Sequence, residues 1–475
     1  MLKQFQDNEN DLLETFFNAT FHKFQKSPFL KSDVFQTLEM IVTPQCNQRC
    51  EYCYITKYGD SLYPQHIRAD HDTTLSNMKK LMDYLTYEKH YYFIEYELFA
   101  GDLYTTNLLV DSLNLMIPYF EYIKDKAPEI FQYDEIRLVI PTNLQFVMDE
   151  EFTNGIIALH NRLESIGVNV NWSWSHYGKY SADTREKKEL TDEFYEKAFT
   201  FCHKTNAGIH PMLSAQDADK AISNFDWWVE MYAKYLPERV ENGECYPRYL
   251  EVRNGDEWTD DNIEHYLGYL KHRLEYVYSI CNDDTEAVAK YLFRAPDAEK
   301  KNFEDYDAFD VITSNTNDTS VMSCIMQKSI IVRISDLAIV PCHRLTYDMF
   351  IGGWFTVEDE KIVGFKANNV TQLIDTKMHR IDLDPICATC WNRSSCIHGC
   401  LGAQYEWSGE LYLPIASVCK MQKAKTSFIL KMVCDTGIMS YAMQFKHLDS
   451  KHKDNLKKLC ERLGYSYGAT ITNTI

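Results

Sequence analysis

Three cysteines in one short segment are the first residues whose types and spacing could do chemistry. Cys46, Cys50 and Cys53 follow an apolar, strand-like run and have the spacing C-x3-C-x2-C. Three thiolates this close can bind three irons of a four-iron cluster and leave the fourth iron without a protein ligand. A structural zinc ion prefers pairs of C-x2-C and a fourth ligand nearby, whereas the nearest candidate, His66, lies thirteen residues beyond Cys53. The pattern therefore favours an iron–sulfur cluster with one open iron.

A second group of cysteines lies near the carboxyl end of the chain. It consists of Cys387, Cys390, Cys396, Cys400 and Cys419, in the pattern C-x2-C-x5-C-x3-C-x18-C. One tetrahedral zinc ion would leave a thiol over, so more than one metal cluster is expected. Structural disulfides are not expected, because a reducing cytosol keeps thiols free.

Alternating strand-like and helix-like segments must position the first group. The strand-like runs are residues 37–42, 91–99, 135–140, 168–174, 208–213 and 246–252. Residues 72–89 and 149–166 have helical periodicity, and Gly167 is placed to end the second helix. Such alternation predicts parallel βαβ units, hence an α/β fold with a curved sheet or partial barrel and helices outside. The functional loops are then expected at the carboxyl ends of the strands.

Composition and charge exclude several classes of function. The chain has 475 residues with 49 Lys and Arg against 69 Asp and Glu, a net charge of −20. A surface of that sign repels phosphates and anionic lipids, so neither a nucleic acid nor a membrane is an expected partner. No apolar run approaches the roughly 18 residues of a transmembrane helix, and the first residues do not resemble a secretory signal. The expected location is cytoplasmic.

The chain is predicted to have five consecutive parts. These are an N-terminal helical segment (1–35), the partial barrel (36–252), an acidic helical connector (253–320), a cysteine-rich domain (321–425) and a helical tail (426–475). Residues 251–310 contain sixteen acidic and seven basic residues. That surplus indicates either a solvated helical face or a docking surface for a basic partner.

The first cysteine group resembles the signature of the radical S-adenosylmethionine (radical SAM) enzymes, which follows the first strand of a partial (β/α)6 barrel. The resemblance implies that Cys46, Cys50 and Cys53 hold a [4Fe-4S] cluster that binds S-adenosylmethionine. One electron then cleaves this cofactor to methionine and a 5'-deoxyadenosyl radical, which abstracts a hydrogen atom from the substrate. The protein supplies placement and exclusion of solvent.

The same resemblance implies contacts to S-adenosylmethionine from several strand ends. The residues that match are Tyr52, Ala100, Gly101, Asp102, Asn143, Ser173 and Arg185. Tyr52 is expected near the adenine, and Arg185 is a candidate for the methionine carboxylate. The family usually has Gly-Gly-Glu after the second strand, whereas this chain has Ala100-Gly101-Asp102. Asp102 is therefore expected to contact the methionine amino group with a side chain that is shorter than that of the usual glutamate.

The second group resembles the SPASM domain of radical enzymes that modify peptides and proteins. The resemblance assigns Cys387, Cys390, Cys396 and Cys419 to an outer auxiliary [4Fe-4S] cluster, and Cys324, Cys342 and Cys400 to an inner one. A fourth inner cysteine is missing from the stretch 314–323. The inner cluster then has an open iron, or Cys281, Asp318 or a similar group closes it. His343, directly after one inner ligand, is the candidate catalytic residue.

Together the two resemblances imply a radical SAM peptide maturase with three [4Fe-4S] clusters. The expected reaction is oxidative cross-linking, through a thioether or a carbon–carbon bond, in a ribosomally made precursor peptide. The alternatives are a formylglycine-forming enzyme of the anaerobic sulfatase-maturing type, and an iron–sulfur electron carrier or scaffold without catalysis. An electron donor such as flavodoxin or ferredoxin is implied. Only 45 residues precede Cys46, too few for the peptide-recognition module of some relatives. The precursor is therefore expected to be recognised by a separate peptide-recognition protein, by the acidic segment 251–310 or by the basic tail.

Overall fold

The structure of the chain is a computed structural model that describes most of its residues. The described residues are 13–18, 33–133, 136–181, 190–247, 250–251, 255–299, 328–379, 384–396 and 399–466. They belong to two compact units, each built from several stretches of chain. Unit 1 comprises Met1–Ser175, Lys188–Gly208 and Cys324–His379, and unit 2 comprises His176–Lys187, Ile209–Ser323 and Arg380–Ile475. Each unit is therefore built from stretches that are far apart along the chain.

Unit 1 contains a large sheet whose central strands are parallel. Its strands are β1 (Asp33–Thr43), β2 (Tyr91–Ala100), β3 (Ile136–Thr142), β4 (Val168–Trp174), β8 (Ser329–Arg333), β9 (Ala338–Val340), β10 (Gly353–Glu358) and β11 (Lys361–Ala367). The order is β11-β10-β9-β8-β1-β2-β3-β4, followed by the two-residue strand β5 (Gly208–Ile209). Strands β8, β1, β2, β3 and β4 run parallel, and β9, β10 and β11 continue as an antiparallel meander. The first four strand predictions are confirmed.

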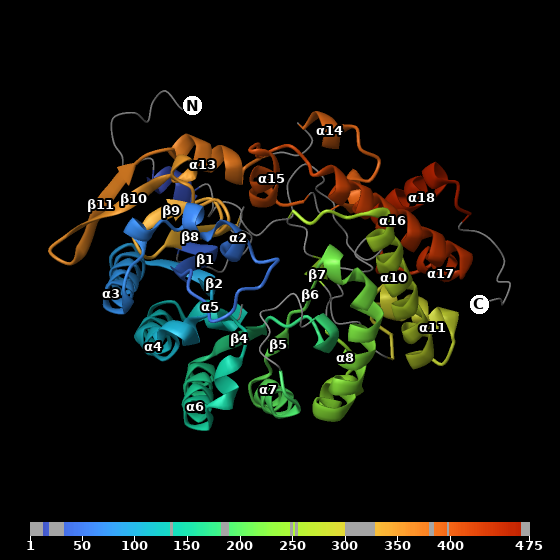
Figure 1. Cartoon of the computed structure of the whole chain (residues 1–475), viewed down its shortest axis with the longest axis horizontal. Coiled ribbons are helices and arrows are strands. Elements are labelled where there is room, and N and C mark those ends of the chain that lie inside the picture. Colours follow the sequence, from blue (N-terminus) through green and yellow to red (C-terminus); the bar gives the residue numbers. More distant parts are fainter. Residues whose placement is uncertain are drawn as a thin grey trace. The chain divides into compact units, whose positions relative to one another are not determined.

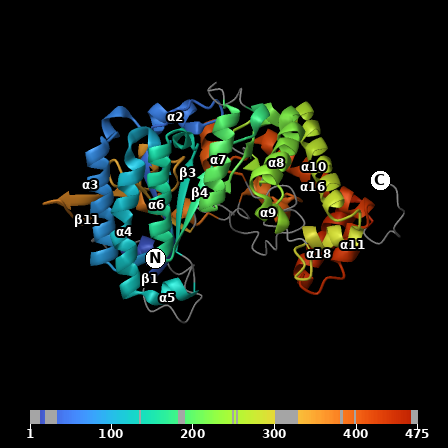
Figure 2. The same ribbon diagram turned by 90° about the horizontal axis from the view of Figure 1, so that it is seen from below.

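Helices cover one face of this sheet (Figure 1). The helices of unit 1 are α2 (Tyr54–Leu62), α3 (His71–Met82), α4 (Leu108–Lys126), α5 (Pro128–Tyr133), α6 (Glu150–Ile166), α7 (Asp192–Thr205) and α13 (Val370–Lys377). Figure 2 shows α3, α4, α6 and α7 running side by side. Met78, Leu81 and Met82 of α3 are fully buried, as their helical spacing predicts. Gly167 ends α6 with a positive φ of 102°, the backbone conformation for which glycine is favoured.

The opposite face of the sheet is polar. Side chains alternate between the two faces of a strand, and the burial of β3 and β4 alternates with them. In β3, Leu138 and Ile140 are fully buried, whereas Arg137 and Val139 are only partly buried. We call this side the polar face; it carries Glu39, Glu95, Glu97, Phe99, Arg137, Asn169, Asn171 and Ser173. Hydrogen-bonding groups therefore dominate the face that helices α3, α4 and α6 do not cover.

Unit 2 is mainly helical. It contains α8 (Ala221–Tyr235), α9 (Pro237–Glu241), α10 (Asp260–Ile280), α11 (Thr285–Leu292), α14 (Pro385–Ala388), α15 (Leu401–Ser408), α16 (Ala416–Asp435), α17 (Ile438–Ala442) and α18 (Ser450–Leu463). Helix α10 packs against α8 and α16. Thr259 starts α10 with a capping box that includes Asn262. The described part of the acidic connector predicted from the sequence contains the helices α10 and α11.

Two strand predictions are wrong in detail. The run 208–213 forms two short strands, β5 and β6 (Met212–Leu213), because Pro211 between them has no backbone N–H for a sheet hydrogen bond. Within the described part of the run 246–252 only β7 (Leu250–Glu251) is a strand, and it pairs in parallel with β6 as a separate two-stranded sheet.

The cysteine-rich part predicted over 321–425 is shared between the units. Its described residues up to His379 lie in unit 1, where they supply β8 to β11. None of the helices in the described part of the chain combines the length and the apolar composition needed to cross a membrane.

Candidate functional site

The first cysteine group lies in the loop between β1 and α2, at the carboxyl end of the strand as predicted. Cys50 is buried and Cys46 and Cys53 are half-buried. The sulfur of Cys46 accepts a hydrogen bond from the backbone N–H of Gln48 at 3.4 Å, and Asn143 Nδ2 lies 4.0 Å from it. Burial raises the pKa of the Cys46 thiol to about 11. N–H donors to cysteine sulfurs are compatible with an iron–sulfur cluster, whose reduction potential such hydrogen bonds tune.

A glycine at the end of β2 allows the loop that carries Cys46 to pack closely. The backbone N–H groups of Gly101 and Asp102 donate to the carbonyls of Thr43 and Gln45, each at 2.8 Å. A Cβ atom on Gly101 would lie 2.2 Å from the carbonyl oxygen of Gln45. Only glycine can therefore occupy this position without moving the backbone next to Cys46.

The carboxylate of Asp102 joins the ends of β2 and β3. Asp102 is 1% exposed, and it accepts hydrogen bonds from the Tyr104 N–H at 3.0 Å, the Thr142 hydroxyl at 3.2 Å and the Asn143 N–H at 2.9 Å. The Asn143 amide in turn donates to Asn47 Oδ1 at 2.7 Å, inside the cysteine loop. Asp102 therefore positions Asn143 and the loop, and its contact with S-adenosylmethionine stays a prediction.

His343 lies over the polar face, directly after Cys342. Its Nδ1 is 2.9 Å from Glu39 Oε1 on β1, and its ring stacks on Phe99 of β2 with 4.2 Å between centroids and 5° between planes. In the neutral tautomer whose Nδ1 donates to the Glu39 carboxylate, Nε2 is the acceptor of the ring. The His343 side chain is 27% exposed. Sequence reasoning found His343 but missed Glu39, which fixes its ring.

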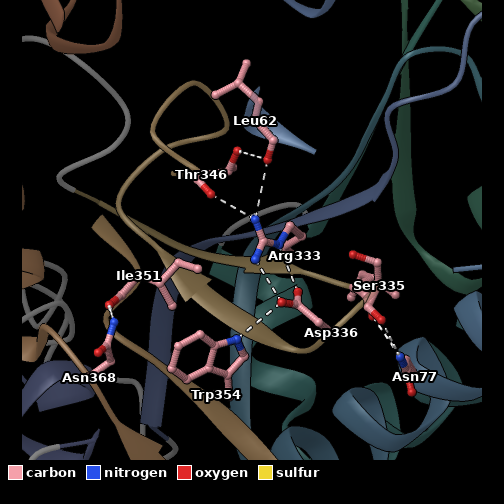
Figure 3. A network of polar contacts seen from close by, with 10 residues as sticks. Leu62, Asn77, Arg333, Ser335, Asp336, Thr346, Ile351, Trp354 and Asn368 are labelled. Atoms are coloured by element: carbon pink, nitrogen blue, oxygen red, sulfur yellow. Dashed lines mark hydrogen bonds and ion pairs between the residues drawn. The ribbon is translucent and has the colours of Figure 1, made fainter. Parts of the chain in front are cut away.

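A buried arginine, Arg333, lies at the centre of a polar network that includes Thr346 and Leu62 (Figure 3). Arg333, at the end of β8, is 1% exposed and forms two 2.8 Å hydrogen bonds with the carboxylate of Asp336. Its Nη1 donates to the carbonyl of Thr346 at 2.8 Å and to that of Leu62 at 3.5 Å. Trp354 Nε1 donates to the same carboxylate at 3.2 Å. Arg333 thus ties the segment after Cys342 to the end of α2.

Glu97 on the polar face has a carboxyl group with a raised pKa. Burial raises its pKa well above the ordinary value of 4.5, and the charges of Glu39 and Glu95 raise it further. Glu39 is its neighbour in register on β1. Glu95, two residues earlier on β2, differs because Arg137 lies 3.3 Å from it and Thr37 donates to it at 3.1 Å. Glu97 therefore keeps its proton to a higher pH than an ordinary glutamate does.

We expect Glu97→Gln to stabilise the protein at neutral pH. Folded Glu97 holds a proton that the unfolded chain releases above about pH 4.5, so the wild type loses stability as the pH rises from there through the raised pKa. The gain from Glu97→Gln should accordingly vanish below that pH in urea unfolding curves. Glu95→Gln is the matched control and should destabilise, because it breaks the contact with Arg137. A pH-independent effect of Glu97→Gln would contradict the assignment.

The second cysteine group surrounds one cavity in unit 2. The empty volume between the atoms that line this cavity is about 690 Å³, and part of this volume is open to solvent. The lining cysteines are Cys387, Cys390, Cys396, Cys400 and Cys419. Burial raises the pKa of Cys387 to about 12, and Asp384 and the thiols of Cys396, Cys419 and Cys390 contribute. No three His, Cys, Asp or Glu side chains among the described residues converge closely enough for a single ion. The cysteines instead enclose a space, as cluster ligands do.

The structure places only some of the remaining predicted site residues. Cys342 is buried in unit 1 and Cys281 is buried in unit 2. Tyr52 lies in the cysteine loop, Ala100 ends β2, and Ser173 lies on the polar face. Cys324, Arg185 and Asp318 lie outside the described residues, so the ligands of the inner cluster and the carboxylate contact stay predictions.

The described chain has an α/β core with a parallel sheet and a cysteine loop after its first strand, and this fold is also found in a solved structure. The chain is similar in fold to the solved structure of native anSMEcpe with bound AdoMet, an anaerobic sulfatase-maturating enzyme of the radical SAM/SPASM class. The TM-score is 0.50 at 15% identity, over 86% of this chain and 99% of that one. No protein-family model and no curated protein matches the chain.

Proposed function

We propose that this protein is a radical SAM enzyme that oxidises a polypeptide. The observation that carries the proposal is the C-x3-C-x2-C loop at the end of the first parallel strand, held by Gly101 and Asp102 and beside a polar sheet face. The donors aimed at Cys46 fit a cluster at Cys46, Cys50 and Cys53. With its cluster, S-adenosylmethionine supplies a 5'-deoxyadenosyl radical that removes a substrate hydrogen atom.

The proposed reaction is oxidative cross-linking within a ribosomally made precursor peptide. Joining two residues removes two hydrogens from the peptide: one leaves as a hydrogen atom, and the other leaves as a proton and an electron. An auxiliary iron–sulfur cluster bound in the cysteine-lined cavity of unit 2 would accept that electron. Further proposed partners are flavodoxin or ferredoxin as the electron donor and a separate protein that presents the peptide.

The residues of the polar face bind and orient the peptide in this proposal. Glu39 fixes the ring of His343 through Nδ1, and stacking on Phe99 fixes its plane. His343 Nε2 can then accept a hydrogen bond from the reacting residue of the substrate. Arg137 and Asn171 offer further hydrogen-bonding groups on the same face.

Formylglycine formation on a protein substrate is the second candidate. The fold similarity to anSMEcpe favours it, since that protein is a sulfatase-maturating enzyme. Both candidates need the same removal of a hydrogen atom, a proton and an electron. They differ in the product, because an aldehyde reacts with a hydrazide and a cross-link does not.

The deciding experiment measures deoxyadenosine and peptide mass together. The reconstituted protein is incubated without oxygen with S-adenosylmethionine, dithionite and a peptide encoded beside it; the control is the Cys46→Ala/Cys50→Ala/Cys53→Ala variant. Deoxyadenosine with a two-hydrogen loss and no hydrazide reaction supports cross-linking. A hydrazide-reactive product supports formylglycine. No deoxyadenosine from protein with intact clusters would leave an electron carrier or scaffold.

We expect His343→Phe to lower peptide conversion without lowering deoxyadenosine formation. Phenylalanine keeps the stacking on Phe99 but loses the hydrogen bond to Glu39 and the acceptor at Nε2. Peptide conversion should fall about tenfold or more, the effect of one lost hydrogen bond, while deoxyadenosine formation continues. His66→Phe, at an exposed histidine after α2, is the control. Equal losses of conversion and deoxyadenosine would contradict a substrate contact by His343.

A further inference from the structure

The strongest unexplained polar group in the described chain is the amide of Asn392. Its side chain is 1% exposed, and neither Oδ1 nor Nδ2 has a hydrogen-bond partner among the described residues. A buried polar group without a partner is costly, so a native structure rarely contains one without a ligand, an ion or a functional role. The amide lines the cysteine cavity of unit 2.

The local backbone does not use this side chain. Asn392 precedes the helical turn Arg393–Ser395, a position where asparagine usually caps the N–H groups of the turn. Here its side chain makes no capping hydrogen bond, and only its backbone carbonyl accepts, from Ser395 N–H at 3.0 Å. The amide is thus buried at the cavity although it makes no hydrogen bond with the turn.

We propose that the Asn392 amide donates a hydrogen bond to a sulfur of the iron–sulfur cluster in this cavity and raises the reduction potential of that cluster. The inference rests on the proposed function, which places the cluster there. One-electron reduction of the cluster adds a negative charge to its irons and sulfurs, so a donor to sulfur favours the reduced state. Arg393 and Lys423 also line the cavity, and their positive charges act in the same direction. The cavity therefore suits an electron acceptor.

The test is a redox titration followed by electron paramagnetic resonance. The holoprotein carries Cys46→Ala/Cys50→Ala/Cys53→Ala, so that only auxiliary clusters remain, and dithionite supplies the electron. The signal of the cluster in this cavity is the one that Cys387→Ala/Cys390→Ala abolishes. Asn392→Leu keeps the size of the side chain and removes the donor. We expect its reduction equilibrium to shift about tenfold toward the oxidised cluster, which is about 59 mV for one electron.

Two more variants make the result decisive. Thr389→Val is the matched control, since exposed Thr389 lies in the same segment, donates to the Pro385 carbonyl at 3.3 Å and does not line the cavity; its potential should equal the wild type. Asn392→Asp keeps the shape, loses the donor and should also shift the potential downward. An unchanged potential in Asn392→Leu overturns the inference. Loss of the cluster in both Asn392 variants, but not in Thr389→Val, overturns it in favour of a structural role.

Failure of the inference can be told apart from failure of the proposed function. If the protein with Asn392 intact binds no iron and sulfide at Cys387, Cys390, Cys396 and Cys419, the proposed cluster itself is wrong. If the cluster forms and only its potential is insensitive to Asn392, the radical-enzyme proposal stands and the inference about Asn392 is wrong.

Discussion

Gly101→Ala should abolish S-adenosylmethionine cleavage although it changes no cluster ligand. The new Cβ would lie 2.2 Å from the Gln45 carbonyl oxygen and 2.7 Å from that of Pro44, and both are backbone atoms. Such a clash cannot be relieved by turning a side chain, so the loop must move and carry Cys46 with it. Overpacking of this kind costs about 1–3 kcal/mol of the free energy of unfolding. Deoxyadenosine formation should fall to the level of the variant without the three loop cysteines.

A second glycine provides the control for this prediction. Gly155 lies on the exposed side of α6, and a Cβ there would meet no atom within 4 Å. Gly155→Ala should therefore keep full activity and stabilise the protein by about 1 kcal/mol through helix propensity. Circular dichroism and a urea unfolding curve report whether Gly101→Ala is folded. If that variant is folded and keeps normal cleavage, the close packing of the loop is not needed for the reaction.

The sequence predicted the elements whose signals are local. The apolar runs of β1 to β4 and the glycine after α6 are readable within a few residues, and the structure confirms them. The split of residues 208–213 was not predicted, although Pro211 interrupts that run. The confirmed predictions share one cause: strand alternation and helix termination depend on neighbours in sequence.

The parts that could not be predicted depend on partners far away in sequence. Glu39 is buried beside His343, 304 residues later, so nothing near Glu39 indicates that it orients a histidine. Strand β8 pairs with β1 across a similar distance, with Ser329 opposite Thr37. Glu95 and Glu97 alternate with apolar residues, which is a local signal of a polar sheet face, but no such face was predicted from the sequence. For Asn392, the proposed role rests on a three-dimensional observation, the lack of hydrogen-bond partners for its amide among the described residues.

Arg333→Met should destabilise unit 1 by about 3 kcal/mol. Methionine fills part of the same space but leaves the Asp336 carboxylate and the carbonyls of Thr346 and Leu62 without their shared donor. Breaking a buried ion pair by removing one partner costs about 3–5 kcal/mol. The lower end applies because the Asp336 side chain is 22% exposed and keeps its hydrogen bond from Trp354. Urea unfolding measures the change.

A surface pair in the same unit separates this effect from a general loss of charge. Arg162 on α6 and Glu121 on α4 lie 3.5 Å apart with side chains 55% and 53% exposed, so Arg162→Met should change stability by less than about 1 kcal/mol. Arg333→Met should also reduce peptide conversion, because the segment that carries His343 loses its anchor to α2. If the two variants behaved alike, the β8–β9 hairpin alone would hold that segment, and the long-range contact from Arg333 to Leu62 would be dispensable.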